Sequence, residues 1–289
     1  MNEKSQLTIK SHFRRLKEEY NLSKSKYANI LVLGDVGTGK TQLYATCPKP
    51  CLIDSFDPNG TSTAALQPLI DSGDIIVRRF EDDDWNHPHS YREWEKDFLL
   101  WKRNGWFDHI ATYGIDSVTN WAPSLLYHMM ALGKGKNVSP HPGAAPFQSD
   151  YLWQQLHAGN ILRKEIMTLP CHTLVTGHPH YWKDDISGKT MFGLLMWGKI
   201  ADQVPLLFDE KYIMKVSGTK HMIQTKNDGV VHAETRMGGT KFEKLMEPDI
   251  RALLKLAGKS WEDKPRIEDL EDEPSNTVDG ERLHTTKQP

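Results

Sequence analysis

Short apolar runs alternate with longer segments of mixed polarity over most of the chain. The runs at 27–33, 50–54 and 171–176 are apolar enough for buried strands inside a parallel sheet, and 74–80 and 109–116 also favour strands. The segments 40–46, 90–103, 119–132 and 149–168 lie between them and favour helices. In one of these helices Trp94, Phe98 and Trp101 recur at helical spacing, which indicates a buried face. The pattern predicts an α/β fold with a mostly parallel central sheet flanked by helices.

The pattern changes towards the C-terminus. Residues 201–216 favour a helix followed by a strand, and 247–256 a last helix. Two alternating runs flank Asn227-Asp228-Gly229 within 220–237, which is typical of a β-hairpin. We therefore expect antiparallel strands at the C-terminal end of the sheet.

Both ends of the chain are polar, which predicts a central domain at 27–258. Residues 1–26 carry seven Lys or Arg against three Glu and predict a short amphipathic helix or a mobile arm, either for subunit docking or simply solvated. Residues 259–289 are acidic and poor in large apolar side chains, which predicts a disordered tail. Such a tail fits a DNA mimic, a docking segment for a single-strand binding protein, or a solubility tail.

Composition narrows the class of protein. The 289 residues carry a net charge of −2, but the nine acids and four bases of residues 262–289 leave the remainder at +3. No run of about 18 apolar residues and no secretory leader is visible, so we expect no membrane segment. Three cysteines without metal-ligand spacing favour a reducing, cytoplasmic location and argue against zinc.

Residues 34–41, GDVGTGKT, match the phosphate-binding loop G-x-x-x-x-G-K-[ST] in full, between a buried strand and a helix. Backbone amides of such a loop wrap a phosphate chain, Lys40 reaches its β- and γ-phosphates, and the Thr41 hydroxyl can bind Mg²⁺. The predicted nucleotide-binding residues are Gly34, Asp35, Val36, Gly37, Thr38, Gly39, Lys40, Thr41 and Gln42.

A phosphate loop also needs a carboxylate that holds the magnesium ion from the end of a neighbouring strand. Asp116 ends an apolar strand and fits best, although it could instead cap the next helix. Asp54, which ends another strand, is the competing carboxylate.

The order and spacing of GDVGTGKT, CLIDSFDP, YGIDSVTN, LVTGHPH and GKIADQVPLLFDEKYIM over about residues 27–256 resemble the RecA-type recombinase core. More narrowly, the chain is similar to the minimal RecA-like ATPases of phages, which include single-strand annealing proteins. The resemblance implies ATP and Mg²⁺ as cofactors, a homo-oligomer in ring or filament form, and single-stranded DNA as partner. It also implies that Asp116, with Ser117 beside it, lies on the family's magnesium strand.

The resemblance departs at one catalytic position. The family carries a glutamate that positions the attacking water where this chain has Phe56, which predicts slow hydrolysis. Asp57, one residue on, could replace it, or could simply form an Asp-Pro turn. His178 occupies the family's γ-phosphate sensor position, where the alternative is a structural histidine.

The resemblance further implies two DNA-binding loops, at 133–148 and about 179–198. Their candidate residues are Lys134, Lys136 and His141, and Tyr181, Trp182, Lys183, Lys189, Phe192 and Trp197. Lysines would neutralise phosphates and aromatic rings would stack on bases; alternatively Phe192 and Trp197 are core and the lysines solvated surface. Lys199 would reach a neighbouring subunit's nucleotide.

The sequence thus predicts an ATP-dependent single-stranded DNA-binding recombination protein of phage type, acting in annealing or strand exchange, with slow, DNA-stimulated ATPase activity. One alternative is a nucleotide-dependent interaction module, such as a helicase loader or packaging accessory ATPase. The other is a small-molecule P-loop kinase, against which stands the lack of an Arg-rich lid segment.

Overall fold

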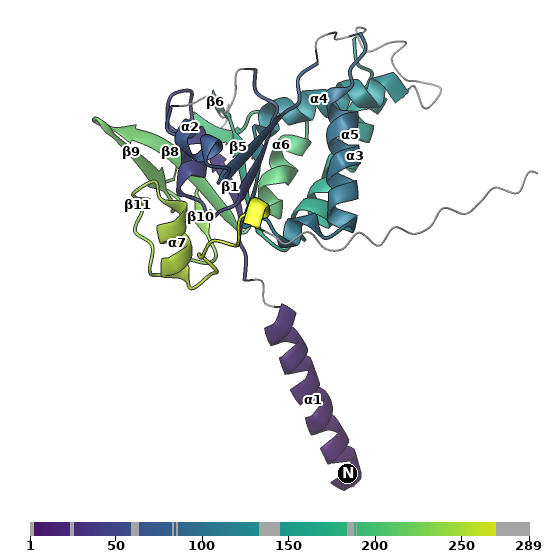
Figure 1. The fold of residues 1–289 in the computed structure, drawn as a ribbon, viewed down its shortest axis with the longest axis vertical. Coiled ribbons are helices and arrows are strands. Elements are labelled where there is room, and N and C mark those ends of the chain that lie inside the picture. Colours follow the sequence, from purple (N-terminus) through teal and green to yellow (C-terminus); the bar gives the residue numbers. More distant parts are fainter. Residues whose placement is uncertain are drawn as a thin grey trace, which may run out of the picture.

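The structure is a computed structural model that describes residues 3–23, 26–58, 64–82, 84, 86–132, 145–183, 188, 190–229 and 231–269. It confirms the mixed α/β fold with a large, mostly parallel central sheet (Figure 1). Within these residues the sheet has nine strands in the order β11-β9-β8-β1-β5-β4-β2-β3, with β10 paired to β8. A separate hairpin is formed by β6 and β7.

The strands are β1 (Asn29–Leu33), β2 (Cys51–Ser55), β3 (Ile75–Arg79), β4 (Thr112–Asp116), β5 (His172–Gly177), β6 (Pro179–Lys183), β7 (Thr190–Leu194), β8 (Glu210–Ser217), β9 (Lys220–Gln224), β10 (Glu234–Thr235) and β11 (Leu245–Met246). The α-helices are α1 (Glu3–Ser23), α2 (Gln67–Asp71), α3 (Ser90–Arg103), α4 (Val118–Leu132), α5 (Gln148–Asn160), α6 (Ile200–Gln203) and α7 (Ile250–Ala257). Shorter helical segments are η1 (Thr41–Thr46), η2 (Trp106–Asp108), η3 (Ile161–Ile166), η4 (Val204–Leu207) and η5 (Ile267–Asp269).

The central parallel strands β1, β2, β4 and β5 are buried on both faces, as their apolar sequences require. Figure 1 shows α3, α4 and α5 together on one side of the sheet and α7 on the other. Trp94 and Trp121 are fully buried on the first side, and Tyr44 and Leu254 on the second. The carboxyl ends of β1, β2, β4 and β5 therefore meet at one edge, where polar loops can gather.

Several predicted boundaries shift. The predicted helix at 40–46 is a 3₁₀ helix, η1, and the predicted helix at 149–168 begins at Gln148 and continues from α5 into the π-helical η3. The segment 179–198, predicted as irregular, contains the hairpin of β6 and β7. Among the described residues, no helix is both long and apolar enough to span a bilayer.

The C-terminal hairpin was predicted at the wrong turn. It is formed by β8 and β9 around Gly218, which has a positive φ of 63°. The Asn227-Asp228-Gly229 turn instead belongs to the connection after β9, where the side chains of Asn227 and Asp228 accept hydrogen bonds from the amides of Gly229 and Val231. These side-chain bonds satisfy the turn without any strand pairing.

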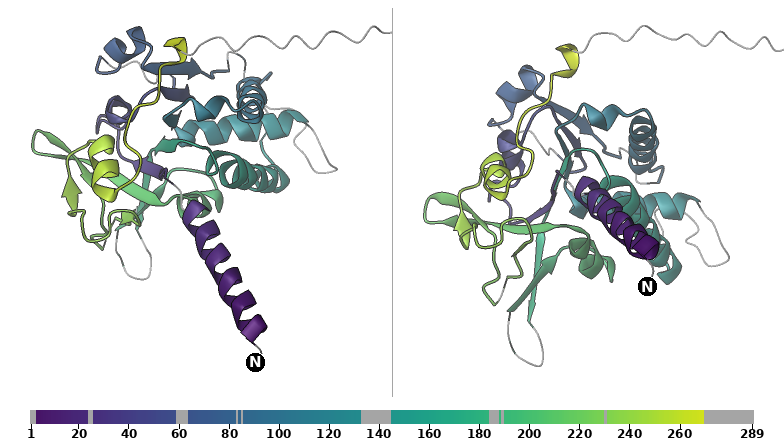
Figure 2. Two further views of the ribbon diagram at one scale, coloured as in Figure 1. Left: turned by 60° about the horizontal axis from the view of Figure 1, so that its bottom comes forward. Right: turned by 90° about the horizontal axis from the view of Figure 1, so that it is seen from below.

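The two chain ends differ from each other. Helix α1 extends away from the sheet (Figures 1 and 2). The tail predicted to be disordered from residue 259 is ordered over residues 259–269, which we call the C-terminal strap; residues 270–289 lie outside the described part.

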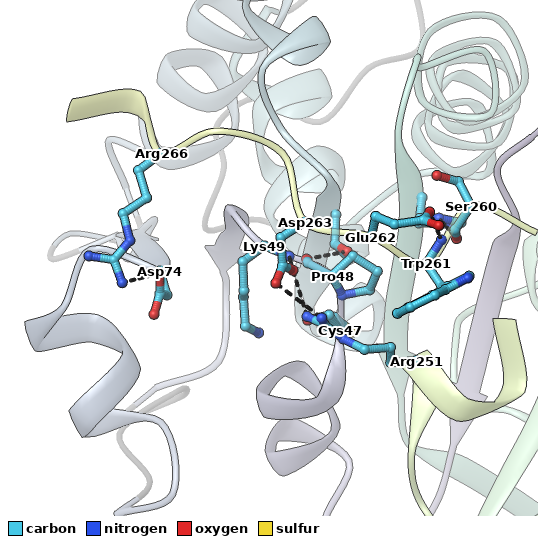
Figure 3. Close-up of polar contacts among 12 residues, drawn as sticks. Cys47, Pro48, Lys49, Asp74, Arg251, Ser260, Trp261, Glu262, Asp263 and Arg266 are labelled. Atoms are coloured by element: carbon cyan, nitrogen blue, oxygen red, sulfur yellow. Dashed lines mark hydrogen bonds and ion pairs between the residues drawn. The ribbon is translucent and has the colours of Figure 1, made fainter. Parts of the chain in front are cut away.

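Trp261 and Ile267 of this strap pack against the core, but most of its other contacts are made by charged residues, which explains why its composition suggested disorder. Figure 3 shows the Asp263 carboxylate between the backbone amide of Lys49, at 2.6 Å, and the guanidinium of Arg251, also at 2.6 Å. Further along, Arg266 lies 2.9 Å from Asp74.

Candidate functional site

The phosphate-binding loop follows β1 in the middle of the sheet. Gly37 and Gly39 have positive φ angles of 78° and 91°, which favour glycine. A Cβ atom at Gly34 would lie 2.6 Å from Thr38 Oγ1 and 2.9 Å from Met214 Cβ, so no larger residue fits there. The glycines of the motif are therefore required by the shape of the loop.

Lys40 is held inside this loop. Its ammonium group donates hydrogen bonds to the carbonyl oxygens of Gly34, at 2.7 Å, and Asp35, at 3.0 Å. Burial lowers the pKa of Lys40, while the nearby carboxylates of Asp116, Asp57 and Asp35 oppose this shift. The lysine is thus a buried cation at the point where a phosphate chain would enter.

The Asp116 carboxylate lies beside Thr41, at the end of β4. The Thr41 hydroxyl donates to Asp116 Oδ2 at 2.9 Å, and the Thr176 hydroxyl donates to Asp116 Oδ1. Burial raises the pKa of Asp116, and the neighbouring Asp57 charge adds to that shift. A hydroxyl and a carboxylate side by side are the hard oxygen ligands that Mg²⁺ prefers, so these two residues fit a magnesium ion.

Asp54, the competing carboxylate, is engaged elsewhere. It is fully buried beneath α3, where the Arg78 guanidinium binds both its oxygens at 2.7 and 2.8 Å. Trp94 Nε1 and the Tyr113 hydroxyl also donate to Oδ2, at 2.8 and 2.7 Å. With these four donors its role is structural.

Asp57 points towards the phosphate loop, whereas Phe56 does not. The Phe56 ring is buried against Phe80 and Trp94, with ring centroids 5.4 and 5.9 Å away. Asp57 Oδ1 accepts hydrogen bonds from the Ser117 hydroxyl and from Asn120 Nδ2, both at 2.6 Å. Burial raises the pKa of Asp57, but the nearby His178 ring and the hydrogen bonds from Ser117 and Asn120 outweigh this effect and lower the pKa, so the carboxylate is ionised at neutral pH.

His178 follows β5 and faces Asp57. Its Nε2 atom lies 3.9 Å from Asp57 Oδ2, and its backbone amide donates to the Thr119 hydroxyl at 2.9 Å. Both residues line a cavity of about 310 Å³ above the phosphate loop. The other lining residues are Val36, Gly37, Gly39, Lys40, Thr41, Gln42 and His221. Sequence reasoning missed His221, because no motif connects β9 with the loop.

The hairpin of β6 and β7 touches the phosphate loop directly. The Tyr181 hydroxyl donates to Asp35 Oδ2 at 3.1 Å, and burial, with the Asp35 charge adding to it, raises the pKa of Tyr181 to about 12. Tyr181, Trp182 and Lys183 are exposed on this hairpin.

The structure describes only some of the other residues predicted to bind DNA or a neighbouring subunit. Phe192 is buried in the core, in agreement with the alternative interpretation, whereas Trp197 is 48% exposed and packs against Tyr151. Lys134, Lys136, His141 and Lys189 lie outside the described residues. Lys199 is exposed just before α6 and is not among the residues lining the cavity.

Comparison with known proteins yields only distant likenesses in structure. No protein-family model matches the chain, and no curated protein matches it. Among solved structures, the chain is similar to a prototypical ATPase from the type III secretion system of pathogenic bacteria, with 13% identity and a TM-score of 0.42. The match covers 65% of this chain, which spans about half (52%) of the length of that ATPase.

Proposed function

We propose that this chain binds ATP with Mg²⁺ and hydrolyses it slowly. One observation carries the proposal: Lys40 and Thr41 line one cavity, and the carboxylate of Asp116, 75 residues from Thr41 in the sequence, lies directly behind them and accepts a hydrogen bond from the Thr41 hydroxyl. This is the arrangement of ammonium, hydroxyl and carboxylate that a magnesium-bound triphosphate requires.

Each residue has a separate task in this proposal. The loop amides and Lys40 bind the phosphates, and Thr41 and Asp116 hold the magnesium ion. When bound, Mg²⁺ neutralises charge that develops on the phosphate oxygens. The ionised Asp57 accepts a proton from water and orients it, and His178 lies where it can contact the terminal phosphate.

We further propose that nucleotide controls binding of single-stranded DNA in a homo-oligomer, as in phage recombination by annealing or strand exchange. The exposed aromatic and basic side chains of the β6–β7 hairpin support this, because they suit stacking on bases and contact with phosphates. Lys134, Lys136 and Lys189 would add positive charge, and Lys199 would act on a neighbouring subunit.

A nucleotide-dependent interaction module is the second candidate. Phe56, buried where the resemblance places a catalytic glutamate, favours binding of nucleotide without turnover. The two candidates differ in whether phosphate is released.

The test combines calorimetry with phosphate release. We expect wild-type protein to bind ATP in the presence of Mg²⁺ and Lys40→Ala to lose this binding, and we expect single-stranded DNA to increase phosphate release. Exposed Lys244→Ala serves as the matched control. Binding without release would favour the interaction module, whereas equal binding by Lys40→Ala would contradict the nucleotide site itself.

A further inference from the structure

His221 enters the cavity from a part of the sheet that the hydrolysis residues do not use. It lies near the start of β9, and its Nδ1 atom is 2.9 Å from the carbonyl oxygen of Thr38 in the phosphate loop. A Cβ atom on Gly39 would lie 3.5 Å from the same ring nitrogen. The imidazole therefore packs directly on the loop backbone.

The strand order places His221 opposite the hydrolysis residues. Asp57, Asp116 and His178 follow or end β2, β4 and β5, which all lie on one side of β1. Strand β9 lies on the other side of β1, beyond β8. The cavity thus has one end near the carboxylates and another near the His221 ring.

The proposed function fixes how a nucleotide would be oriented in this cavity, and the inference about His221 rests on that proposed function. If the terminal phosphate and its magnesium ion lie beside Thr41 and Asp116, the phosphate chain runs along the loop and the nucleoside leaves on the remaining side. That side is where β9 contributes His221. The ring is then a protein group placed to meet the sugar or base.

The hydrogen bond to Thr38 defines what the ring can recognise. A carbonyl oxygen only accepts hydrogen bonds, so Nδ1 is the donor and, when the imidazole is neutral, carries its one proton. Nε2 is then an acceptor, which pairs with a hydroxyl or amino donor and not with a phosphate oxygen. A nucleoside offers such donors on its ribose and on its base.

We propose that His221 is a specificity-determining residue that binds the nucleoside part of the triphosphate through Nε2. The Thr38 carbonyl fixes the ring, and the nucleoside supplies the donor. The ring adds affinity for a nucleotide but none for a bare phosphate chain.

The test compares two ligands by calorimetry in the presence of Mg²⁺: ATP, and inorganic triphosphate, which has no nucleoside. We expect His221→Ala to weaken ATP binding about tenfold, which corresponds to roughly 1.4 kcal/mol, and to leave inorganic triphosphate binding unchanged. His109→Ala, which removes an exposed histidine away from the cavity, should change neither. Two further ligands, tested with wild-type protein, identify which group of ATP donates the hydrogen bond to Nε2. Weaker binding of 2′-deoxy-ATP than of ATP would identify the ribose 2′-hydroxyl, and weaker binding of inosine triphosphate would identify the adenine amino group.

Two results would overturn this inference while the proposed function stands. Equal losses for ATP and inorganic triphosphate would mean that the ring only holds the Thr38 carbonyl, and no loss for either would mean that it makes no contact. By contrast, failure of wild-type protein to bind either ligand, or unchanged ATP binding by Lys40→Ala, would overturn the nucleotide site and this inference together.

Discussion

Three aspartates at the carboxyl ends of neighbouring strands have different roles because their surroundings differ. Asp54 faces the α3 side and is neutralised by Arg78, whereas Asp116 and Asp57 face the phosphate loop. The sequence identified all three as candidates but left open which of them bind the ligand. The direction in which each side chain points at the end of its strand decides which aspartates reach the ligand. That direction depends on packing partners that are distant in the sequence.

Asp57→Asn tests the water-orienting role. We expect the rate of ATP hydrolysis to fall about 100-fold, because an amide cannot accept the proton of the attacking water, while ATP affinity stays within about twofold. Single-turnover phosphate release and calorimetry would measure the two quantities. Asp202→Asn, an exposed aspartate on α6, is the control; full turnover by Asp57→Asn would exclude Asp57 from catalysis.

Asp54→Asn tests the structural role of the buried ion pair. We expect the free energy of unfolding to fall by about 3 kcal/mol, because the Arg78 guanidinium, whose side chain is 15% exposed, loses its charge partner. Urea denaturation would measure this loss.

Asp97→Asn is the matched control for this change. Asp97 also contacts Arg78, at 3.5 Å, but it is 45% exposed, so its replacement should cost less than about 1 kcal/mol. Equal losses in the two variants would contradict the assignment, and an Asp54→Asn protein that folds but no longer binds ATP would return Asp54 to the list of magnesium ligands.

At the scale of elements, the parallel strands were predictable and the hairpins were not. Buried strands such as β1 and β4 can be recognised in the sequence as apolar runs, because other parts of the protein pack on both of their faces. Strand β6 is exposed along most of its length, so it has no apolar pattern, and backbone pairing with β7 alone defines it. For the same reason the Asn227-Asp228-Gly229 turn was misleading, since turn residues do not specify which strands pair.

Trp182→Ala tests the proposed contact of the β6–β7 hairpin with single-stranded DNA. The Trp182 ring is 41% exposed and stacks on His180, with centroids 5.6 Å apart. Loss of a stacking surface should weaken oligonucleotide binding by about 1–3 kcal/mol. Fluorescence anisotropy at several salt concentrations would measure the affinity and its decrease with ionic strength.

Trp153→Ala is the matched control, because Trp153 is 53% exposed but lies on α5 rather than on the hairpin. The proposal requires a larger loss for Trp182→Ala than for Trp153→Ala. Equal effects, or an affinity that is insensitive to salt, would argue against binding at the hairpin.

At the scale of the whole molecule, the C-terminal strap fastens the edge of the sheet opposite the site. The Lys264 ammonium donates to the carbonyl oxygens of Asp108, Ile110 and Pro170, at 2.9, 2.6 and 3.1 Å. Ser260 contributes a carbonyl to His172 of β5. Sequence patterns could not reveal these contacts, because single polar residues pair over separations of 88 residues or more.

The neutral His172 ring, at the start of β5, links the segment before β1 to the C-terminal strap through two hydrogen bonds. Its Nδ1 atom accepts a hydrogen bond from the Ala28 amide at 3.1 Å, so Nε2 carries the proton and donates to the Ser260 carbonyl at 2.8 Å. Burial lowers the pKa of His172 to about 4, and the positive charges of Lys259 and Lys264 add to this shift. A second proton on Nδ1 would face the Ala28 N–H donor.

This arrangement predicts that His172 destabilises the fold in mild acid. Between pH 6.5 and 4 the unfolded chain binds a proton at His172 that the folded chain excludes, so the free energy of unfolding falls as the pH falls. From pH 7 to pH 4 this one group should remove about 3 kcal/mol. A glutamine in the variant His172→Gln can keep both hydrogen bonds but does not titrate. Urea denaturation should therefore show that this variant loses about 3 kcal/mol less stability than wild-type protein between pH 7 and pH 4. Parallel pH profiles for the two proteins would show that His172 is protonated in the folded state as easily as in the unfolded chain.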